Sequence, residues 1–384
     1  MSTELAPGAR FPEEWRSELE ALGEPGYRAL QIFRWIHKRG ELDPEKMTDL
    51  PKGLRETLVR SGLRPPAEVL DVQRAGDGTR KLLLGLGEGA RVECVVIPMT
   101  RLSEGDADVS ASLDEELDEE PAPEPKTRVT LCVSTQFGCA MGCTFCASGR
   151  AGLGRGLGAD EIVSQVILAR RELAPDEELK NLVFMGMGEP LHHYDSTARA
   201  LRLLTHPEGG GMSPRRITVS TVGLVPGLKK LGQDFGGKVG LAVSLHAPDD
   251  ATRDRIIPMN RRYPVHDLIQ ALRDYPLPRR RRITIEYTLI DGVNDTDAHA
   301  ERLTRLLRGI PVKVNLIPMN PVAGSGFSAS PPERVEAFQA RVTEAGYSCF
   351  VRTRRGDDVN AACGQLALSP ELVPLGRRGS AAAS

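Results

Sequence analysis

The sequence predicts an α/β fold: an incomplete barrel of six βα units, preceded by an N-terminal helical domain and a small β extension. Three observations predict it. Apolar runs alternate with amphipathic stretches from residue 128 onward, as in parallel strands covered by helices. Residues 12–60 show helical periodicity, and residues 67–98 consist of short β-prone runs. Six strands also fit a doubly wound sheet, and the pattern alone does not separate the two arrangements.

Residues 1–62 form the predicted helical domain. In the stretch YRALQIFRWIHKRG, Ala29, Ile32, Phe33 and Ile36 recur at helical spacing, and Gly40 stands where the helix would end. A second amphipathic helix is predicted in LPKGLRETLVRSG.

Residues 63–102 form the predicted β extension. A Gly-Asp-Gly turn separates two apolar runs in VLDVQRAGDGTRKLLLGL, which predicts a β-hairpin. The following stretch, RVECVVIP, is the next predicted strand and carries Glu93.

An acidic insertion, residues 103–127, follows this extension. Residues 103–125 contain ten acidic residues and no basic residue. Such a stretch cannot bury enough apolar surface to offset the entropy of ordering, so we expect it to be disordered. Removing it leaves 42 acidic residues against 50 basic ones, a net charge of +8. Each basic cluster taken alone fits a solvated surface, but together they favour a polyanionic partner such as nucleic acid.

Residues 128–368 form the predicted core domain. Its strand candidates are RVTLCV, NLVFM, RITVS, GLAVS, RITIEYTL and KVNLI. Parallel α/β folds bind ligands at the C-terminal ends of their strands. The segments GCAMGCTFCASG and GMGEP follow the first and second strands, so they are the candidate functional loops. Residues 369–384 are of low complexity, and we expect a flexible tail.

The composition argues against a membrane or secreted protein and points to metal or redox chemistry. The sequence has no apolar run of about 18 residues and no signal-peptide pattern, so we expect no membrane contact and a cytoplasmic location. Seven cysteines are present, three of them clustered. In a reducing compartment, such a cluster indicates metal or redox chemistry.

The cluster consists of Cys139, Cys143 and Cys146, at Cys-x3-Cys-x2-Cys spacing and surrounded by glycine and small residues. Thiolates are ligands for zinc and for iron–sulfur clusters. Structural zinc usually takes four protein ligands, whereas three cysteines on a [4Fe–4S] cluster leave one iron open to a small chelating molecule. Cys132 is a candidate fourth ligand, so a zinc-containing RNA-binding module without catalysis is the alternative hypothesis.

This cysteine loop, placed after the first strand of a βα repeat, resembles that of the radical S-adenosylmethionine (SAM) superfamily, in which SAM chelates the open iron of a [4Fe–4S] cluster. More narrowly, the chain resembles the RlmN/Cfr family of RNA adenine methyltransferases, and the RlmN branch is favoured. The resembling stretches are GYRALQIFRWIHKRG, LCVSTQFGCAMGCTFC, FMGMGEP, RRITVSTVG, VSLHAP, EYTLIDGVND, VNLIPMNP and RGDDVNAACGQL.

The resemblance implies a cofactor pocket. The three clustered cysteines would ligate the iron–sulfur cluster, and Gly188 and Glu189 would meet the amino group of SAM. The rest of the pocket would be lined by Ser220, Ser244, Leu245, His246 and Asn320.

The resemblance also implies covalent catalysis. Cys363 would carry the methyl group as S-methylcysteine, because the electron-poor C2 and C8 carbons of adenine cannot attack a sulfonium. Glu93 would accept the ring proton, and Cys132 would form a transient disulfide with Cys363. Taken alone, Cys132 is typical of a buried strand residue and Glu93 of an acid on a sheet surface. Cys94 and Cys349 are expected to be small core residues.

The implied substrate is RNA: 23S ribosomal RNA first, and transfer RNA as a second substrate. Methylation of C2 is favoured, with C8 or another RNA position as the alternative. We expect the helical domain to contact RNA, a reductase or flavodoxin-type protein to donate the electron, and the chain to be a monomer. The basic residues expected on the polar face of the first helix are Arg28, Arg34, Lys38 and Arg39.

Overall fold

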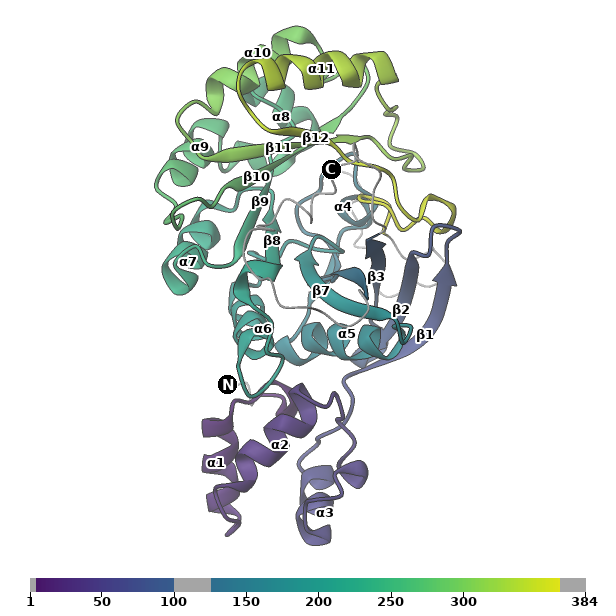
Figure 1. Cartoon of the computed structure of the whole chain (residues 1–384), viewed down its shortest axis with the longest axis vertical. Helices are drawn as coiled ribbons and strands as arrows, with labels where there is room; N and C mark the ends of the chain where they lie inside the picture. The colour runs from purple at the N-terminus through teal and green to yellow at the C-terminus, as the bar shows by residue number, and fades with distance from the viewer. Residues whose placement is uncertain (1–4, 100–125, 367–384) are drawn as a thin grey trace, which may run out of the picture.

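The computed structural model describes residues 5–99 and 126–366, and its parts follow one another along the long axis (Figure 1). The N-terminal helices lie at one end, a long twisted sheet occupies the middle, and helices α8 to α11 lie at the other end. The predicted insertion, 103–127, and the predicted tail, 369–384, fall outside the described residues, except for Lys126 and Thr127, the second of which is the first residue of a strand.

The helical domain contains α1 (Pro12–Ala21), α2 (Arg28–His37) and α3 (Lys52–Arg60). The apolar positions predicted for α2 are buried, and Gly40 adopts a positive φ of +70° after the helix. The domain packs on the core partly through Phe33, whose ring lies 4.8 Å from that of His206.

The β extension is an antiparallel meander of β1 (Ala67–Arg74), β2 (Arg80–Leu86) and β3 (Arg91–Met99), with the predicted turn between β1 and β2. Strand β3 pairs antiparallel with β4 (Thr127–Cys132), so the extension continues the core sheet.

All six predicted core strands are present. They are β4, β7 (Glu177–Phe184), β8 (Ile217–Thr221), β9 (Gly240–Ser244), β10 (Ile283–Leu289) and β11 (Val312–Pro318). A short strand that the sequence did not predict, β12 (Cys349–Val351), pairs parallel with β11. The sheet order is β1-β2-β3-β4-β7-β8-β9-β10-β11-β12. Because this order never reverses, the sheet has no topological switch point, which favours the incomplete barrel over the doubly wound sheet.

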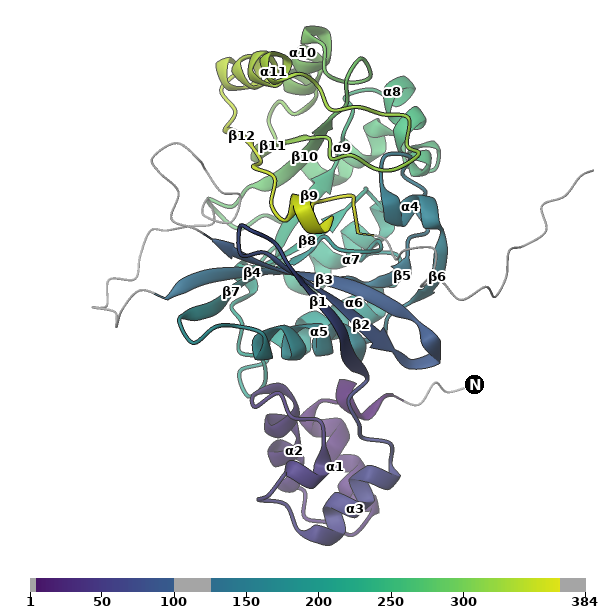
Figure 2. The same ribbon diagram turned by 90° about the vertical axis from the view of Figure 1, so that its right-hand side faces the viewer.

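Helices cover the outside of the curved sheet (Figure 2). The amphipathic stretches that the sequence places between the core strands form α5 (Ala159–Arg171), α6 (Tyr194–Thr205), α7 (Val225–Phe235), α9 (Val265–Arg273) and α10 (Asp297–Leu306). The sequence did not predict α4 (Ala147–Ala151), α8 (Asp250–Ile256) or α11 (Pro332–Glu344). It also missed the separate two-stranded pair β5 (Gln136–Gly138) and β6 (Leu153–Gly156), which flanks the cysteine loop.

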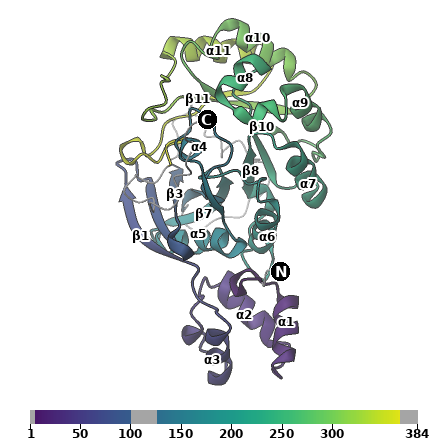
Figure 3. The same ribbon diagram turned by 180° about the vertical axis from the view of Figure 1, so that it is seen from behind.

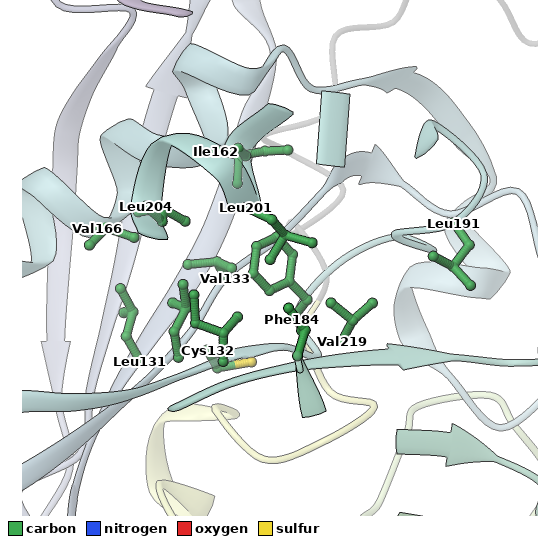
Figure 4. Close-up of a cluster of buried hydrophobic side chains, with 14 of the residues drawn as sticks. Leu131, Cys132, Val133, Ile162, Val166, Phe184, Leu191, Leu201, Leu204 and Val219 are labelled. Carbon is green, nitrogen blue, oxygen red and sulfur yellow. The ribbon is translucent and has the colours of Figure 1, made fainter. Parts of the chain in front are cut away.

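Apolar side chains of α5 and α6 pack on the outer face of the first core strands. Figure 4 shows part of this core. Cys94 and Cys349 are buried in the same core, as predicted. Among the described helices, none is both long and apolar enough to cross a membrane.

Candidate active site

A cavity opens at the C-terminal ends of the parallel strands. Its lining contains most of the site residues predicted from the sequence: Cys139, Cys143, Cys146, Gly188, Glu189, Ser220, Ser244, His246, Asn320 and Cys363. The loops after β4, β7, β8, β9 and β11 and the C-terminal segment therefore meet at one place, as the parallel topology predicts.

The cysteine loop folds tightly because glycine occupies its crowded positions. Gly138 has a φ of +77°, and a Cβ atom there would lie 1.9 Å from the carbonyl oxygen of Gly152. A Cβ atom on Gly149 would lie 2.8 Å from the backbone nitrogen of Cys143. The amide of Cys139 donates to the Gly152 carbonyl at 2.9 Å, which closes the loop. These contacts turn the three cysteines toward the cavity.

The three thiols share an apolar environment. Burial raises the pKa of Cys139 to about 12 and also raises the pKa values of Cys143 and Cys146. A bound cationic metal centre reverses this effect, because it stabilises thiolates. Over residues 5–99 and 126–366, no three His, Cys, Asp or Glu side chains are grouped in a way that could hold a single metal ion. Three thiols around one cavity fit an iron–sulfur cluster, which cysteine thiolates hold. Cys132, the fourth ligand that a structural zinc site would need, lies outside this lining.

Gly188 and Glu189 form the turn after β7. Gly188 has a φ of +102°, and a Cβ atom there would lie 2.6 Å from the side chain of Gln136. Glu189 is buried, and its two carboxylate oxygens accept hydrogen bonds from the backbone amides of Leu191, at 3.0 Å, and Val222, at 2.9 Å. Burial raises the pKa of Glu189 to about 7. An ammonium group in the cavity would favour the ionised carboxylate.

His246 lies after β9 with a φ of +55°, a conformation uncommon for a residue other than glycine. Its Nδ1 accepts a hydrogen bond from the amide of Thr288 at 2.8 Å, and its carbonyl accepts one from Asn294 at 2.7 Å. Burial, followed by the nearby Arg253 charge, lowers the pKa of His246 to about 3. The ring is therefore neutral at physiological pH, with its proton on Nε2.

Arg253 on α8 is a residue that the sequence did not single out. It is buried, and it donates to the carbonyl oxygens of Val222, at 2.5 Å, and Leu245, at 2.9 Å. It also bonds Ser244 at 3.3 Å and Asn260 at 2.9 Å. One guanidinium thus joins the loops after β8 and β9. The side chain of Leu245, which the resemblance placed in the pocket, is fully buried in the main core and does not line the cavity.

Glu286 and Arg352 are two further lining residues that the sequence analysis missed. One carboxylate oxygen of Glu286 accepts from Asn315 at 3.0 Å, while the other is buried without a hydrogen-bond partner. An acid inside the apolar run RITIEYTL is a signal that could have identified Glu286, because charged residues are seldom fully buried. Arg352 lies in a basic run and carries no such signal.

Cys363 lies where this cavity meets a smaller one. The smaller cavity is lined by Cys132 as well as Cys363, and the two cavities share Met185, Ile317, Asn320, Arg352 and Cys363. In Figure 4 the sulfur of Cys132 points away from the core residue Val133 and toward the C-terminal segment. The structure therefore brings together the two cysteines that the sequence analysis paired.

Glu93 lies near this site but outside the lining of both cavities. The β3–β4 register pairs Val95 with Cys132, so Glu93, two residues from Val95, shares the sheet face of Cys132. Its carboxylate forms a buried ion pair with Lys81 at 3.1 Å.

Three of the four basic residues that were expected to contact RNA make contacts within the chain. Arg34 forms an ion pair with Glu208 at 2.6 Å. Arg39 stacks on Trp35, with its guanidinium 4.0 Å from the ring centre. Arg28 donates to Gln31 at 2.7 Å.

The N-terminal helical domain and the core domain each match a known protein family. The radical SAM superfamily matches residues 133–303, and the ribosomal RNA large subunit methyltransferase N-terminal domain matches residues 13–61. A dual-specificity RNA methyltransferase RlmN from Sorangium cellulosum is 59% identical, over 96% of each chain. A probable dual-specificity RNA methyltransferase RlmN from Moorella thermoacetica is 45% identical, over 97% of this chain and 100% of the relative.

A solved structure agrees with these relatives. The crystal structure of a radical SAM methyltransferase from Sphaerobacter thermophilus superimposes with a TM-score of 0.83 at 42% sequence identity, covering 94% of this chain and 99% of that one. The predicted fold class is thereby confirmed. The chain belongs to the RlmN family of radical SAM RNA methyltransferases.

Proposed function

We propose that this chain methylates ring carbon C2 of adenine in 23S ribosomal RNA and in transfer RNA, with Cys363 carrying the methyl group. The observation that carries this proposal is the position of Cys363, between the cavity of the clustered cysteines and the cavity of Cys132. Two RNA substrates correspond to the dual specificity in the names of the relatives, and the RlmN relationship favours C2.

Three features of the large cavity suit the cofactors of the superfamily. Cys139, Cys143 and Cys146 would hold a [4Fe–4S] cluster. Gly188 and Glu189 would receive the amino group of SAM, and polar side chains of Ser220, Ser244, His246 and Asn320 line the remaining wall. When bound, the cluster and SAM would supply an electron, a transferable methyl group and a 5′-deoxyadenosyl radical.

Three residues of the chain carry out the remaining chemical steps. Cys363 takes the methyl group on its sulfur and presents it to the base, which is nucleophilic catalysis by a thiolate. Glu93, whose carboxylate lies beside Lys81, is the proton acceptor for the ring carbon. Cys132 releases the product by attacking the sulfur of Cys363. The disulfide bond forms as the bond between that sulfur and the transferred carbon breaks, and the carbon keeps the electron pair and takes up a proton. The target adenine must leave its stack to reach the cavity.

The remaining expectations concern partners. A reductase or a flavodoxin-type protein would donate the electron, and the chain would act as a monomer in the cytoplasm. The N-terminal helices would contact RNA, an assignment supported by the match of residues 13–61.

The test is methylation by protein reconstituted anaerobically with iron and sulfide. The wild type and Cys363→Ala receive SAM, a reductant and either 23S ribosomal RNA or transfer RNA, and digested nucleosides are identified by mass spectrometry. We expect 2-methyladenosine from both RNAs with the wild type and none with the variant. 8-Methyladenosine would assign the reaction to C8. Full methylation by Cys363→Ala, or no methyladenosine from either RNA, would overturn the proposal.

A further inference from the structure

Two turns from opposite edges of the sheet hold each other by hydrogen bonds. One is the β1–β2 turn, which contains Gly76 and Asp77, and the other follows β12 and contains Gly356 and Asp358. The Asp77 carboxylate accepts from the Gly356 amide at 3.0 Å. The Asp358 carboxylate accepts from the Gly76 amide, also at 3.0 Å. Figures 1 and 3 show the C-terminal segment against the tips of these strands. We call these two reciprocal bonds the clasp.

Each turn is shaped for this contact. The second oxygen of Asp77 accepts from the Thr79 amide at 2.9 Å, so both carboxylate oxygens are used. Partial desolvation opposes ionisation, but hydrogen bonds from Thr79 and Gly356 outweigh it and lower the pKa of Asp77. Gly356 has a φ of +63°, and a Cβ atom there would lie 2.7 Å from the Cβ of Ala361. Only glycine fits a turn this tight.

The clasp lies only a few residues before Cys363. The amide of Ala361 donates to the carbonyl of Gly356 at 2.9 Å, which closes residues 356–361 into one ring-shaped turn. Cys363 follows two residues later. The clasp therefore anchors the chain immediately upstream of the thiol.

The downstream side of Cys363 is anchored separately. Asn320 donates to the carbonyl of Cys363 at 2.9 Å. The amide of Ala147, in the first turn after the cysteine loop, donates to the carbonyl of Gly364 at 2.8 Å. Hydrogen bonds thus hold the chain on both sides of Cys363: the β1–β2 hairpin anchors it upstream, and the cysteine loop anchors it downstream.

We propose that Asp77 and Asp358 are positioning residues: by clasping the two turns, they hold the Cys363 thiol at the junction of the two cavities. This inference deepens the proposed function, because a methyl-carrying thiol must reach both the cofactor and the base. It assigns a role to the β extension beyond carrying Glu93. Neither aspartate lines either of the two cavities, so their effect passes through the 356–363 turn.

The direct readout is the accessibility of Cys363. Holoenzyme reconstituted anaerobically is treated with iodoacetamide, and the carbamidomethylation rate of the Cys363 peptide is followed by mass spectrometry. We expect Asp77→Ala and Asp358→Ala to raise this rate about fivefold to tenfold, the change expected when one typical intramolecular hydrogen bond is lost. The matched controls are Asp71→Ala in the same hairpin and Asp357→Ala in the same turn, neither of which takes part in the clasp, and their rates should stay within about twofold of wild type.

Conservative variants sharpen the test. Asparagine offers one acceptor oxygen in place of two. Asp77→Asn should therefore open the turn partly, since Asp77 uses both oxygens, while Asp358→Asn should behave as wild type, since one oxygen suffices. Equal rates in wild type, Asp77→Ala and Asp358→Ala, with unchanged melting temperatures, would overturn the proposal. If Asp77→Ala fails to fold, Asp77→Asn and Asp358→Ala decide the matter by the same comparison.

A second readout separates this inference from the proposed function. If the Cys363 thiol is misplaced, SAM should be cleaved without methylation of RNA. The ratio of 5′-deoxyadenosine formed to RNA methyl groups formed should therefore rise several-fold in Asp77→Ala. A loss of folded protein, in contrast, lowers both products together and leaves the ratio unchanged. If the wild type methylates no RNA, the proposed function fails while the alkylation contrast still tests the clasp. An unchanged product ratio together with unchanged alkylation would show that the clasp does not position Cys363.

Discussion

Cys132, the last residue of β4, and Cys363, in the C-terminal segment, line the same small cavity. We therefore expect the oxidant diamide to join them in a disulfide, detectable by peptide mapping without reduction. Burial raises the pKa of Cys132 to about 12, so its thiol is protonated at neutral pH and the reaction should quicken as the pH rises. Cys132→Ser and Cys363→Ser should abolish the cross-link.

Cys94 provides the control for this cross-link. It lies in β3, one residue from the cross-strand partner of Cys132, and is fully buried in the core. Side chains alternate along a strand, so Cys94 points to the opposite face of the sheet. Cys94→Ser should leave the cross-link intact. A Cys94–Cys132 disulfide in place of the expected one would contradict the arrangement.

The buried Arg253 guanidinium should be essential for the order of the cofactor pocket. Arg253→Met would leave the carbonyls of Val222 and Leu245 buried without their donor, at about 1–3 kcal/mol for each buried acceptor. We expect the free energy of unfolding to fall by about 3 kcal/mol and SAM binding to weaken, as measured by urea denaturation and by calorimetry. Arg255→Met, on the exposed side of the same helix, is the matched control and should change stability by less than about 0.5 kcal/mol. Equal stability of both variants would show that Arg253 holds no loop.

His37 should make the N-terminal domain sensitive to acid. Both of its ring nitrogens are buried without partners, and burial, then the charge of His206, lowers its pKa from 6.5 to about 3. Below pH 6.5 the unfolded state binds a proton that the folded state does not, so stability falls as the pH falls. Lowering the pH from 7 to 5 should cost about 2 kcal/mol through this residue.

The measurement compares urea unfolding of wild type and His37→Leu at the two pH values. The variant should lose less stability on acidification, by the amount that His37 contributes. His266→Leu removes a histidine whose side chain is 85% exposed. The stability of this variant should fall between pH 7 and pH 5 by as much as that of the wild type. Identical pH dependence in wild type and His37→Leu would mean that His37 takes up its proton in the folded state.

The sequence predicted the elements whose signals are local. The core strands appear as apolar runs such as RITIEYTL, all of whose strand residues are buried, because a parallel strand is covered on both faces. The cysteine loop was predicted from spacing alone, and the structure places its three thiols on one cavity. The helix α11 was missed although Val335, Phe338 and Val342 recur at helical spacing and are buried. In that case the signal was present and was overlooked.

Other features had no local signal. The three-residue strand β12 is too short for any periodicity to show. Arg253 is one of many charged residues in the sequence, and its carbonyl partners, Leu245 and Val222, lie 8 and 31 residues before it. Likewise, the aspartates of the clasp lie in two ordinary turn sequences, and only the closure of the sheet brings them together. Relationships of this kind depend on tertiary packing, which composition and period do not encode.

Glu189 should give the cofactor-free protein an opposite pH dependence to that of His37. Burial raises its pKa from 4.5 to about 7, so between these values the folded state holds a proton that the unfolded state has lost. Its stabilising effect is complete below pH 4.5 and disappears as the pH rises through 7, a change of up to about 3 kcal/mol. Glu189→Gln cannot ionise, so relative to wild type its stability should improve from pH 5 to pH 7.5 in urea titrations. Exposed Glu333→Gln should follow the wild type. A constant difference between wild type and Glu189→Gln across this range would show that the buried carboxyl is already ionised at pH 5.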